Sequence, residues 1–490
     1  MVEPRLLAPT GSVECDAVAT AVWKGGDVDA TDLARIQFAS TSIYHFFFVP
    51  VTIGLAFLMA ILHTKWYRSR DVRYERLTRF FGTLLLINVA IGVVTGLVQE
   101  FQFGMNWSAY SLYVGDVFGA PLAMEGLAAF FLESTFLGLW VFGWKVLPRG
   151  VHLLSAWLVA AGAMLSAAFI MAANSWMQHP VGYETDADTG RPVLNSIWDL
   201  FTNPVFIWGY IHVILAALVT GAVVMLAVSA WQLRKGDHAF TTSALLSLVV
   251  LLPASLLQLG VGSQLGVIET TYQPMKIAAA EAQWETCQPC SFSLFQIGGF
   301  ESSDEEPTKI IQVPHLLSIL ATLSWDGEVV GLNELQAQAE AEYGPGDYIP
   351  PVRAQYYAMR VMAYGGTLIF LFALWGIWLA ARRRLPASRV FLAIAVWLVP
   401  LPLIVNTAGW ILTESGRQPW IVQGLMQTVD GVSATVSATE IIMSLVAFYA
   451  IYLFLIVLDV VLMTRFARRA LDAPEQAVAG DDRDTPALTY

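Results

Sequence analysis

The sequence predicts an all-α integral membrane protein with nine transmembrane helices, its N-terminus outside and its C-terminus inside. Composition is the first observation behind this fold class: of 490 residues, 56% are hydrophobic and 13% are charged, whereas soluble globular chains carry about 25% charged residues. The second is a mean hydropathy of +0.58. The third is a series of nine apolar stretches, each near the roughly 20 residues that a transmembrane helix needs.

The nine predicted spans are separated by polar loops and show no internal repeat. They cover residues 41–62, 81–98, 118–143, 151–173, 205–230, 243–262, 361–381, 390–413 and 441–463. We divide the chain into an N-terminal extension, helices one to six, an outer loop, helices seven to nine and a polar cytoplasmic tail, at residues 1–30, 31–262, 263–354, 355–465 and 466–490.

Basic residues determine the predicted orientation, because cytoplasmic loops are enriched in Lys and Arg. The loop between spans one and two carries six of them, alternate loops continue the bias, and residues 99–117 contain none. The loop at 263–354 is therefore expected outside. The chain lacks the basic stripe typical of nucleic-acid binding, and its first thirty residues lack the features of a cleaved signal peptide.

The three cysteines are too few for a disulfide scaffold or a complete zinc site. Cys287 and Cys290 form a C-x-x-C in the outer loop, and Cys15 has no evident partner. The pair either forms a local disulfide or remains two thiols, and we expect thiols.

Two of the seven histidines are placed inside spans, His45 in span one and His212 in span five. Both spans begin outside, so both imidazoles are expected in the outer leaflet. The alternative for a lone intramembrane histidine is an interhelical hydrogen bond. This count excludes a haem–copper oxidase, which needs about six membrane histidines, and a cytochrome b with two bis-histidine haems, which needs about four.

Four glutamates lie within spans or at their ends: Glu100, Glu125, Glu133 and Glu414. A charge at the bilayer centre costs about 2.5–3.5 kcal/mol, so such residues usually face the bundle interior and serve a site or a proton path. Glu133 follows Glu125 on one helix and is expected about 12 Å deeper. This pair suggests a relay that draws protons from inside. A helix-end or partner-paired glutamate is the alternative, and it suits Glu100 best.

Met362 and Arg360 open span seven at its outer side. Haem iron accepts His/Met axial pairs, and an arginine beside such a pair would suit a haem propionate. A methionine in an apolar helix usually packs, and Arg360 could equally anchor the helix at the interface. These two residues alone leave both alternatives open.

The residues named above lie in ordered blocks through which the sequence resembles subunit I of the cytochrome bd quinol oxidases. The blocks run from about residue 31 to 465 and comprise RIQFASTSIYHFFFVP, GLVQEFQFGMNWSAYSLYVGDVFGAPLAMEG, FFLES, ANSWMQHP, NPVFIWGYIH, KIAAAEAQWET, YYAMRVM and GWILTESGRQPW. The segment from Lys276 to Arg360 is short and resembles the branch without a long loop insertion. The first thirty residues and the Cys287/Cys290 pair fall outside the shared pattern.

The resemblance implies three haems, two haem b and one haem d. His212 and Met362 would be the axial ligands of a low-spin haem b, with Arg360 at its propionates. His45 and Glu414 would be the protein ligands of the high-spin haem b and the haem d, in an order that the resemblance leaves open.

The resemblance also implies roles for polar residues around the haems. Glu125 would lie beside the oxygen-binding iron, as a further candidate ligand, and Glu133 would lie on the proton path below it. Lys276 and Glu281 match the quinol-site pair of the outer loop, and ordinary solvated loop charge is the alternative for both. The haem-binding set further includes an aromatic residue between haems and two charged residues: Trp410, Glu100 and Arg417.

The implied function is a terminal respiratory oxidase of the bacterial cell membrane. Menaquinol or ubiquinol would be oxidised outside, and O2 would be reduced to water with protons taken from inside through Glu133 and Glu125. This arrangement would generate a proton motive force without pumping. The implied partners are subunit II and a small single-span subunit, within the lipid bilayer.

Two other functions remain as alternatives. A secondary transporter would fit nine spans, but it has no need of a His212/Met362 pair and usually shows a repeat. A structural subunit that has lost its haems would be expected to lack several ligands, yet none of the expected positions is missing.

Overall fold

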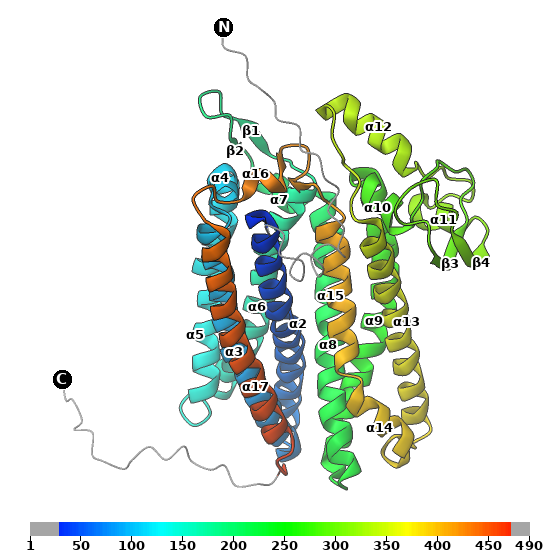
Figure 1. The fold of residues 1–490 in the computed structure, drawn as a ribbon. Coiled ribbons are helices and arrows are strands. Elements are labelled where there is room, and N and C mark those ends of the chain that lie inside the picture. The colour runs from blue at the N-terminus through cyan, green and yellow to red at the C-terminus, as the bar shows by residue number, and fades with distance from the viewer. Residues whose placement is uncertain (1–28, 472–490) are drawn as a thin grey trace, which may run out of the picture.

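The computed structural model describes residues 29–471 as a bundle of long helices that run side by side (Figure 1). This described part contains eight helices long and apolar enough to cross a membrane, or nine spans if one bent pair of helices counts as a single span. The all-α membrane fold is thereby confirmed. The orientation of the bundle stays a prediction. Most of the predicted extension at 1–30 and of the predicted tail at 466–490 lies outside the described residues, which leave out 1–28 and 472–490.

Most spans are single long helices, and the third span consists of three segments, α4, η1 and α5, that follow one another without a break. Their bounds are α2 Ala30–Ser69, α3 Val72–Met105, α4 Ser108–Met124, η1 Glu125–Phe130, α5 Phe131–Phe142, α6 Arg149–Gln178, α8 Pro204–Arg234, α9 Thr241–Tyr272, α13 Val352–Ala381, α14 Arg389–Trp397, α15 Pro400–Ser415 and α17 Ala438–Ala467. Several helices extend beyond their predicted spans, because hydropathy detects only the apolar part of a helix that continues into polar surroundings.

Short elements connect the spans, and most lie at the end of the bundle where the outer loop gathers (Figure 1). The short helices are α7 Ile197–Thr202, η2 His238–Phe240, α10 Pro274–Ala280, α11 Leu316–Thr322, α12 Leu332–Tyr343, η3 Leu385–Ala387 and α16 Thr428–Gly431. Three antiparallel two-stranded sheets pair β1 Tyr183–Thr185 with β2 Pro192–Leu194, β3 Phe292–Ile297 with β4 Thr308–Val313, and β5 Trp420–Val422 with β6 Met426–Gln427.

The predicted span at 390–413 is not one straight helix. It consists of α14 and α15, which meet at an angle of 41°. Pro400 begins α15 and Pro402 follows in its first turn. Since proline lacks the N–H that would continue the preceding helix, the break falls where the sequence places these residues.

Close backbone packing between α2 and α8 holds the centre of the bundle. Gly54 and Gly221 face each other so closely that a methyl group on either would overlap the backbone of the other helix. Small residues permit such approach between membrane helices, whose association depends on van der Waals packing. Around this contact lies the main apolar core, which includes Leu55, Met59 and Val223.

Two expectations from the sequence are wrong. Cys287 and Cys290 form a disulfide, with Cα atoms 5.2 Å apart, so they are not free thiols. More than two histidines belong to the long helices: His152 lies within the predicted span at 151–173, and His63 directly follows the one at 41–62, and both are buried in α6 and α2. Their ring centroids are 4.8 Å apart. Both rings contact Trp140: its indole N–H donates to His63 Nδ1, and its carbonyl oxygen contacts His152 Nε2.

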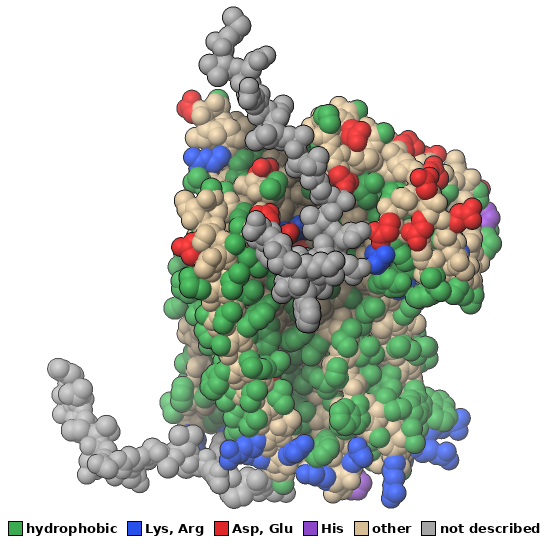
Figure 2. Space-filling model, viewed as in Figure 1, with side chains coloured by type: hydrophobic (Ala, Val, Ile, Leu, Met, Phe, Trp, Pro, Cys, Tyr) green, Lys and Arg blue, Asp and Glu red, His purple; other side chains and the backbone are tan. Residues whose placement is uncertain are grey.

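Charge divides the two ends of the molecule (Figure 2). Lys and Arg side chains gather at the end where α13 and α17 terminate, Asp and Glu side chains gather at the opposite end, and a hydrophobic band lies between them. The band matches the chain's composition, and the basic end coincides with the loops that the sequence analysis places inside.

Candidate functional site

Two buried ion pairs, one formed by Lys276 and one by Glu281, anchor the loop at 263–354 to the long helices near α10. The ammonium of Lys276 contacts Glu269 Oε2 at 2.7 Å and donates to Gln178 Oε1 at 2.6 Å. Lys276 is 3% exposed. Buried charges need such partners because desolvation is otherwise too costly. Burial lowers the pKa of the Lys276 ammonium, and the adjacent Glu269 carboxylate opposes that shift.

The second pair joins the end of α10 to α13. Arg360 Nη2 lies 2.7 Å from Glu281 Oε2, and Nη1 lies 3.1 Å from the other carboxylate oxygen, so the contact is bidentate. Arg360 also donates to the carbonyls of Ala280 and Ser293, and its guanidinium stacks over Tyr356 at 3.7 Å. Burial raises the pKa of the Glu281 carboxyl, while Arg360 opposes the shift.

These contacts decide one open alternative. Lys276 and Glu281 are not solvated loop charges, since both are buried. They do not form a pair with each other in the contacts that the described residues make, because each has its own partner on a long helix. Arg360 was expected at a haem propionate, and the structure places it on Glu281.

Each of three candidate iron ligands faces a glycine on a neighbouring helix. A methyl group built on that glycine would lie 3.2 Å from His45 Cε1 at Gly96, 3.1 Å from His212 Cε1 at Gly262, and 3.2 Å from Met362 Sδ at Gly409. Each glycine therefore allows the candidate ligand to lie directly against the neighbouring helix.

In each of the two histidines, one ring nitrogen lies at hydrogen-bonding distance from a neighbouring side chain. His45 Nδ1 is 2.9 Å from Thr95 Oγ1, and His212 Nε2 is 2.9 Å from Gln258 Nε2. Within the described residues, His212 Nδ1 is buried and has no hydrogen-bond partner. A metal-ligating histidine usually donates its second ring N–H to a hydrogen-bond partner, and His45 Nδ1 can donate in this way to Thr95 Oγ1. For His212, Nδ1 is the ring nitrogen that is unpaired among the described residues, while Nε2 faces the amide NH2 group of Gln258.

Glu414 and Arg417 lie together at the outer end of α15. Glu414 accepts from Arg417 Nη2 at 2.5 Å and from Asn174 Nδ2 at 2.6 Å. Arg417 is 3% exposed, and among residues 29–471 its Nε and Nη1 atoms have no hydrogen-bond partner. Buried, unsatisfied guanidinium nitrogens suit an anionic group such as a propionate. One helical turn before Glu414, Trp410 packs on Phe46 with ring centroids 4.4 Å apart.

Glu125 and Glu133 lie on the third span, where the helix changes its geometry. Glu125 begins the π-helical segment η1, and its carboxylate accepts from Ser166 Oγ at 2.6 Å. Glu133 lies on α5 and packs at Gly162 of α6. π-helical turns are rare and occur frequently at functional sites. Glu100 lies near the end of α3 and is itself exposed at the helix surface.

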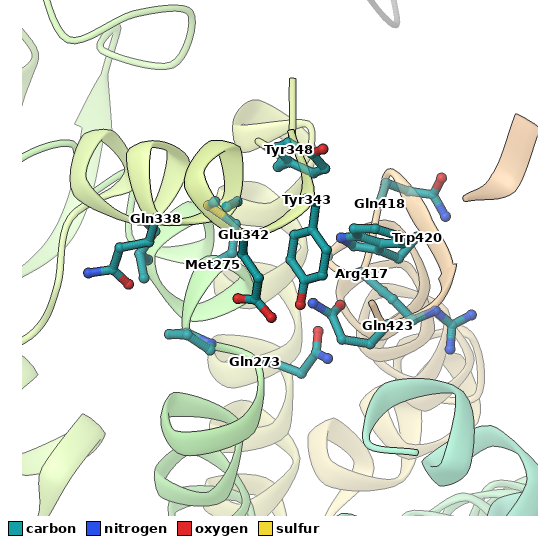
Figure 3. Close-up of a pocket in the computed structure, with 14 residues that line it drawn as sticks. Gln273, Met275, Gln338, Glu342, Tyr343, Tyr348, Arg417, Gln418, Trp420 and Gln423 are labelled. Atoms are coloured by element: carbon teal, nitrogen blue, oxygen red, sulfur yellow. The ribbon is translucent and has the colours of Figure 1, made fainter. Parts of the chain in front are cut away.

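A cavity of about 150 Å³ lies beside Arg417. Figure 3 shows Glu342 and Tyr343 of α12 directed toward Gln273, with Arg417 and Trp420 on the opposite side. Polar and aromatic side chains from the outer loop and from the segment after α15 thus line a common space. The sequence analysis had not connected α12 with the end of α15.

Sequence reasoning missed several polar residues. Asp459 on α17 is an intramembrane carboxylate near Tyr44 and Tyr452, and its Oδ1 is buried without a hydrogen-bond partner in the part of the chain described here. A lone acid within an apolar span was the available signal. Glu269 and Gln178 gave no such signal, because neither lies inside a predicted span.

Between residues 29 and 471, no three His, Cys, Asp or Glu side chains converge on one metal-binding point. The candidate ligands instead occur singly on separate helices, which is how proteins hold haem iron. Fold and site together define a multi-pass membrane protein with ligand residues for haem.

The chain belongs to the cytochrome bd terminal oxidase subunit I family, whose model matches residues 33–471. It is a multi-pass bacterial membrane protein and a subunit of a terminal respiratory oxidase. Membership implies haem cofactors and a subunit II partner. The transporter alternative is thereby set aside.

Relatives cover nearly the whole chain. It is 44% identical over 447 residues to cytochrome bd ubiquinol oxidase subunit 1 of Bacillus subtilis (strain 168), which covers 90% of this chain and 94% of that protein. It is 38% identical over 502 residues to cytochrome bd-II ubiquinol oxidase subunit 1 of Escherichia coli (strain K12), covering 90% and 96%. Among solved structures, the bd oxidase from Geobacillus thermodenitrificans matches with a TM-score of 0.81 and 31% identity, over 90% of this chain and 99% of that one.

Proposed function

We propose that this chain is the haem-bearing subunit of a quinol:oxygen oxidoreductase that oxidises quinol at the outer face and reduces O2 to water. The ion pair between Glu281 and Arg360 carries this proposal. Arg360 lies two residues before Met362 on α13. The loop carboxylate proposed for quinol chemistry is thereby held by the same helix that carries a candidate iron ligand.

The contacts and the family support the proposed ligand set. His212 and Met362 would hold a low-spin haem b, and His45 and Glu414 would hold a high-spin haem b and a haem d, in either order. The remaining haem-binding set is Arg360, Trp410, Glu100 and Arg417, with Glu125 as a further candidate ligand. When bound, haem supplies one-electron transfer and the binding of oxygen.

Glu281 is the proposed acceptor of quinol protons. Its raised pKa makes it a better base than an ordinary glutamate, because a catalytic pKa near the working pH favours proton transfer. Lys276, held by Glu269 and Gln178, would donate a hydrogen bond to the quinol oxygen. Ubiquinol and menaquinol are both compatible with these groups.

Glu133 and Glu125 are proposed to pass protons from the inner side toward oxygen. Their location in an apolar helix supports this role, since an intramembrane carboxylate usually serves a site or a path. The basic end seen in Figure 2 supports the predicted orientation. Proton release outside and uptake from inside would then generate a proton motive force without pumping.

The proposed assembly contains subunit II and a small single-span subunit in the bilayer. The exposed apolar surface of α17, which includes Val446, Leu453 and Phe454, is available to lipid or to these subunits. The structure contains one chain, so the interfaces themselves are part of the proposal.

The test is the reduced-minus-oxidised absorption spectrum of membranes that contain this chain with its subunit II. We expect b-haem bands together with a red-shifted chlorin band. Replacement of His212 or Met362 by Ala should remove the low-spin signal and leave the chlorin band. An unchanged spectrum would rule out this ligand pair, and a folded complex without any haem signal would rule out the proposed function.

A further inference from the structure

A continuous chain of side chains connects the buried lysine of the outer loop to Glu414. Four hydrogen-bonded contacts form it: Glu269 to Lys276 at 2.7 Å, Lys276 to Gln178 at 2.6 Å, Gln178 to Asn174 at 2.9 Å, and Asn174 to Glu414 at 2.6 Å. Gln178 and Asn174 lie four residues apart on α6, so they share one helix face. The chain therefore crosses from the loop to α15 along the end of α6.

The charges at the two ends determine how both amides are oriented. Lys276 has only donors, so Gln178 must present its oxygen to Lys276 and its NH2 group to Asn174. Asn174 must then accept from Gln178 and donate to the carboxylate of Glu414. All donors point from the cation toward the anion. Aligned hydrogen bonds polarise one another in a medium of low dielectric constant.

The two amides also separate electrostatic coupling from proton transfer. Side-chain amides donate and accept hydrogen bonds but carry no ionisable proton at neutral pH. A chain that passes through Gln178 and Asn174 can transmit a change of charge or orientation. It does not provide the ionisable groups of a proton path. Protons released near the loop would consequently stay separate from the oxygen side.

We infer that Gln178 and Asn174 are positioning residues that couple the Lys276 site of the outer loop to Glu414. The inference rests on the proposed function, in which quinol binds near Lys276 and Glu414 holds a high-spin haem. Binding of quinol at Lys276 would then alter the polarity that Glu414 presents to the haem, through the hydrogen bonds of Gln178 and Asn174. Buried Lys276 and Glu269 make this coupling strong because solvent does not screen them.

The experiment uses the whole complex and compares Lys276→Met in two backgrounds. In the native background, Lys276→Met should shift the midpoint potential of the high-spin haem, measured by anaerobic spectral titration. In a Gln178→Leu background, the part of the shift that the hydrogen-bonded chain transmits should be lost, which leaves only the direct charge interaction between Lys276 and Glu414. Gln178→Leu alone should also raise the KM for ubiquinol-1 about tenfold, the factor expected for one lost hydrogen bond to a charged group.

A matched control is Gln355→Leu. Gln355 is fully buried and hydrogen-bonded to Ser415, next to Glu414, but it lies outside the chain of contacts. It should leave the response to Lys276→Met intact. If Gln178→Leu fails to assemble, Gln178→Glu serves instead, since a carboxylate keeps the contact with Lys276 and cannot donate to Asn174.

The outcomes distinguish the inference from the proposed function. A native complex without haem bands or quinol-dependent oxygen uptake would overturn both. A native complex that has them, but in which Lys276→Met shifts the potential equally with and without Gln178, would overturn the coupling alone. A smaller shift in the Gln178 variant and its full retention in the Gln355 variant would establish the coupling.

Discussion

Buried carboxylates occur in two regions of this bundle, and their partners differ. At the outer loop, Glu281 and Glu269 each contact a buried cation within 2.7 Å. On the third span, no ion pair with a Lys or Arg of the described residues involves Glu125 or Glu133, and Glu125 has the hydroxyl of Ser166. A paired carboxylate must weaken its ion pair when it takes up a proton, whereas an unpaired one can gain and lose a proton without that cost.

This difference separates two tasks within one subunit. Carboxylates that anchor the loop contribute to its position and lose stability when the partner is removed. Carboxylates on the third span contribute little to ion pairing, so their substitution should affect turnover more than stability. Substitutions in each region test this separation.

The largest effect on stability is expected from Arg360→Met. The substitution would leave the Glu281 carboxylate buried without its cation, at a cost of about 3–5 kcal/mol. Thermal unfolding of the purified complex should therefore occur at a clearly lower temperature. Arg353→Met is the control on the same helix, because Arg353 pairs with Glu301 while both side chains are more than half exposed. An exposed pair contributes about 0–1 kcal/mol, and equal destabilisation by both variants would contradict the importance of burial.

Glu133→Gln should act on turnover and leave stability unchanged. The amide keeps the shape of the carboxylate but cannot transfer a proton, so oxygen uptake should fall about a hundredfold, within the range of general acid–base effects. Quinol should still reduce the haems, as followed by absorption. Ser134→Ala, at the exposed adjacent position, should retain native turnover. Normal oxygen uptake in the Glu133 variant would remove this residue from the proton path.

The smallest effect is expected from Ser166→Ala. The substitution removes one hydrogen bond to Glu125, worth about 1 kcal/mol, so turnover should decrease by a few-fold with native haem content. Ser155→Ala is the control on the same helix, since that hydroxyl donates to the carbonyl of His152 and contacts no carboxylate. If the two serine variants behave alike, the effect comes from α6 and not from Glu125.

Sequence alone was sufficient for the spans and for residues that are unusual in lipid. His45, His212, Glu125 and Glu133 stand out because polar groups are rare in apolar helices. Sequence could not give the partners of Lys276, since Glu269 precedes it by seven residues and Gln178 by ninety-eight. Such contacts depend on how helices pack, which hydropathy does not encode.

The local geometry of the third span was also not predictable from the sequence. The prediction treated residues 118–143 as one regular helix, yet the segment EGLAAF forms a π-helical turn. No proline or glycine pair marks this change, and only tertiary packing selects it. The bend before α15 was foreseeable from Pro400, whereas the disulfide at Cys287 depended on a turn that composition does not specify.

The π-helical turn has a consequence for the evolution of this subunit. A π turn corresponds to one additional residue inserted into an α-helix. Because the π turn absorbs that residue, the helix after it keeps nearly the same faces, whereas the same residues in a regular α-helix would rotate everything after the segment by about 100°. Glu133 would then leave the face that packs on Gly162. The spacing of the two carboxylates is thus a property of chain length, and point substitutions alone would not reproduce it.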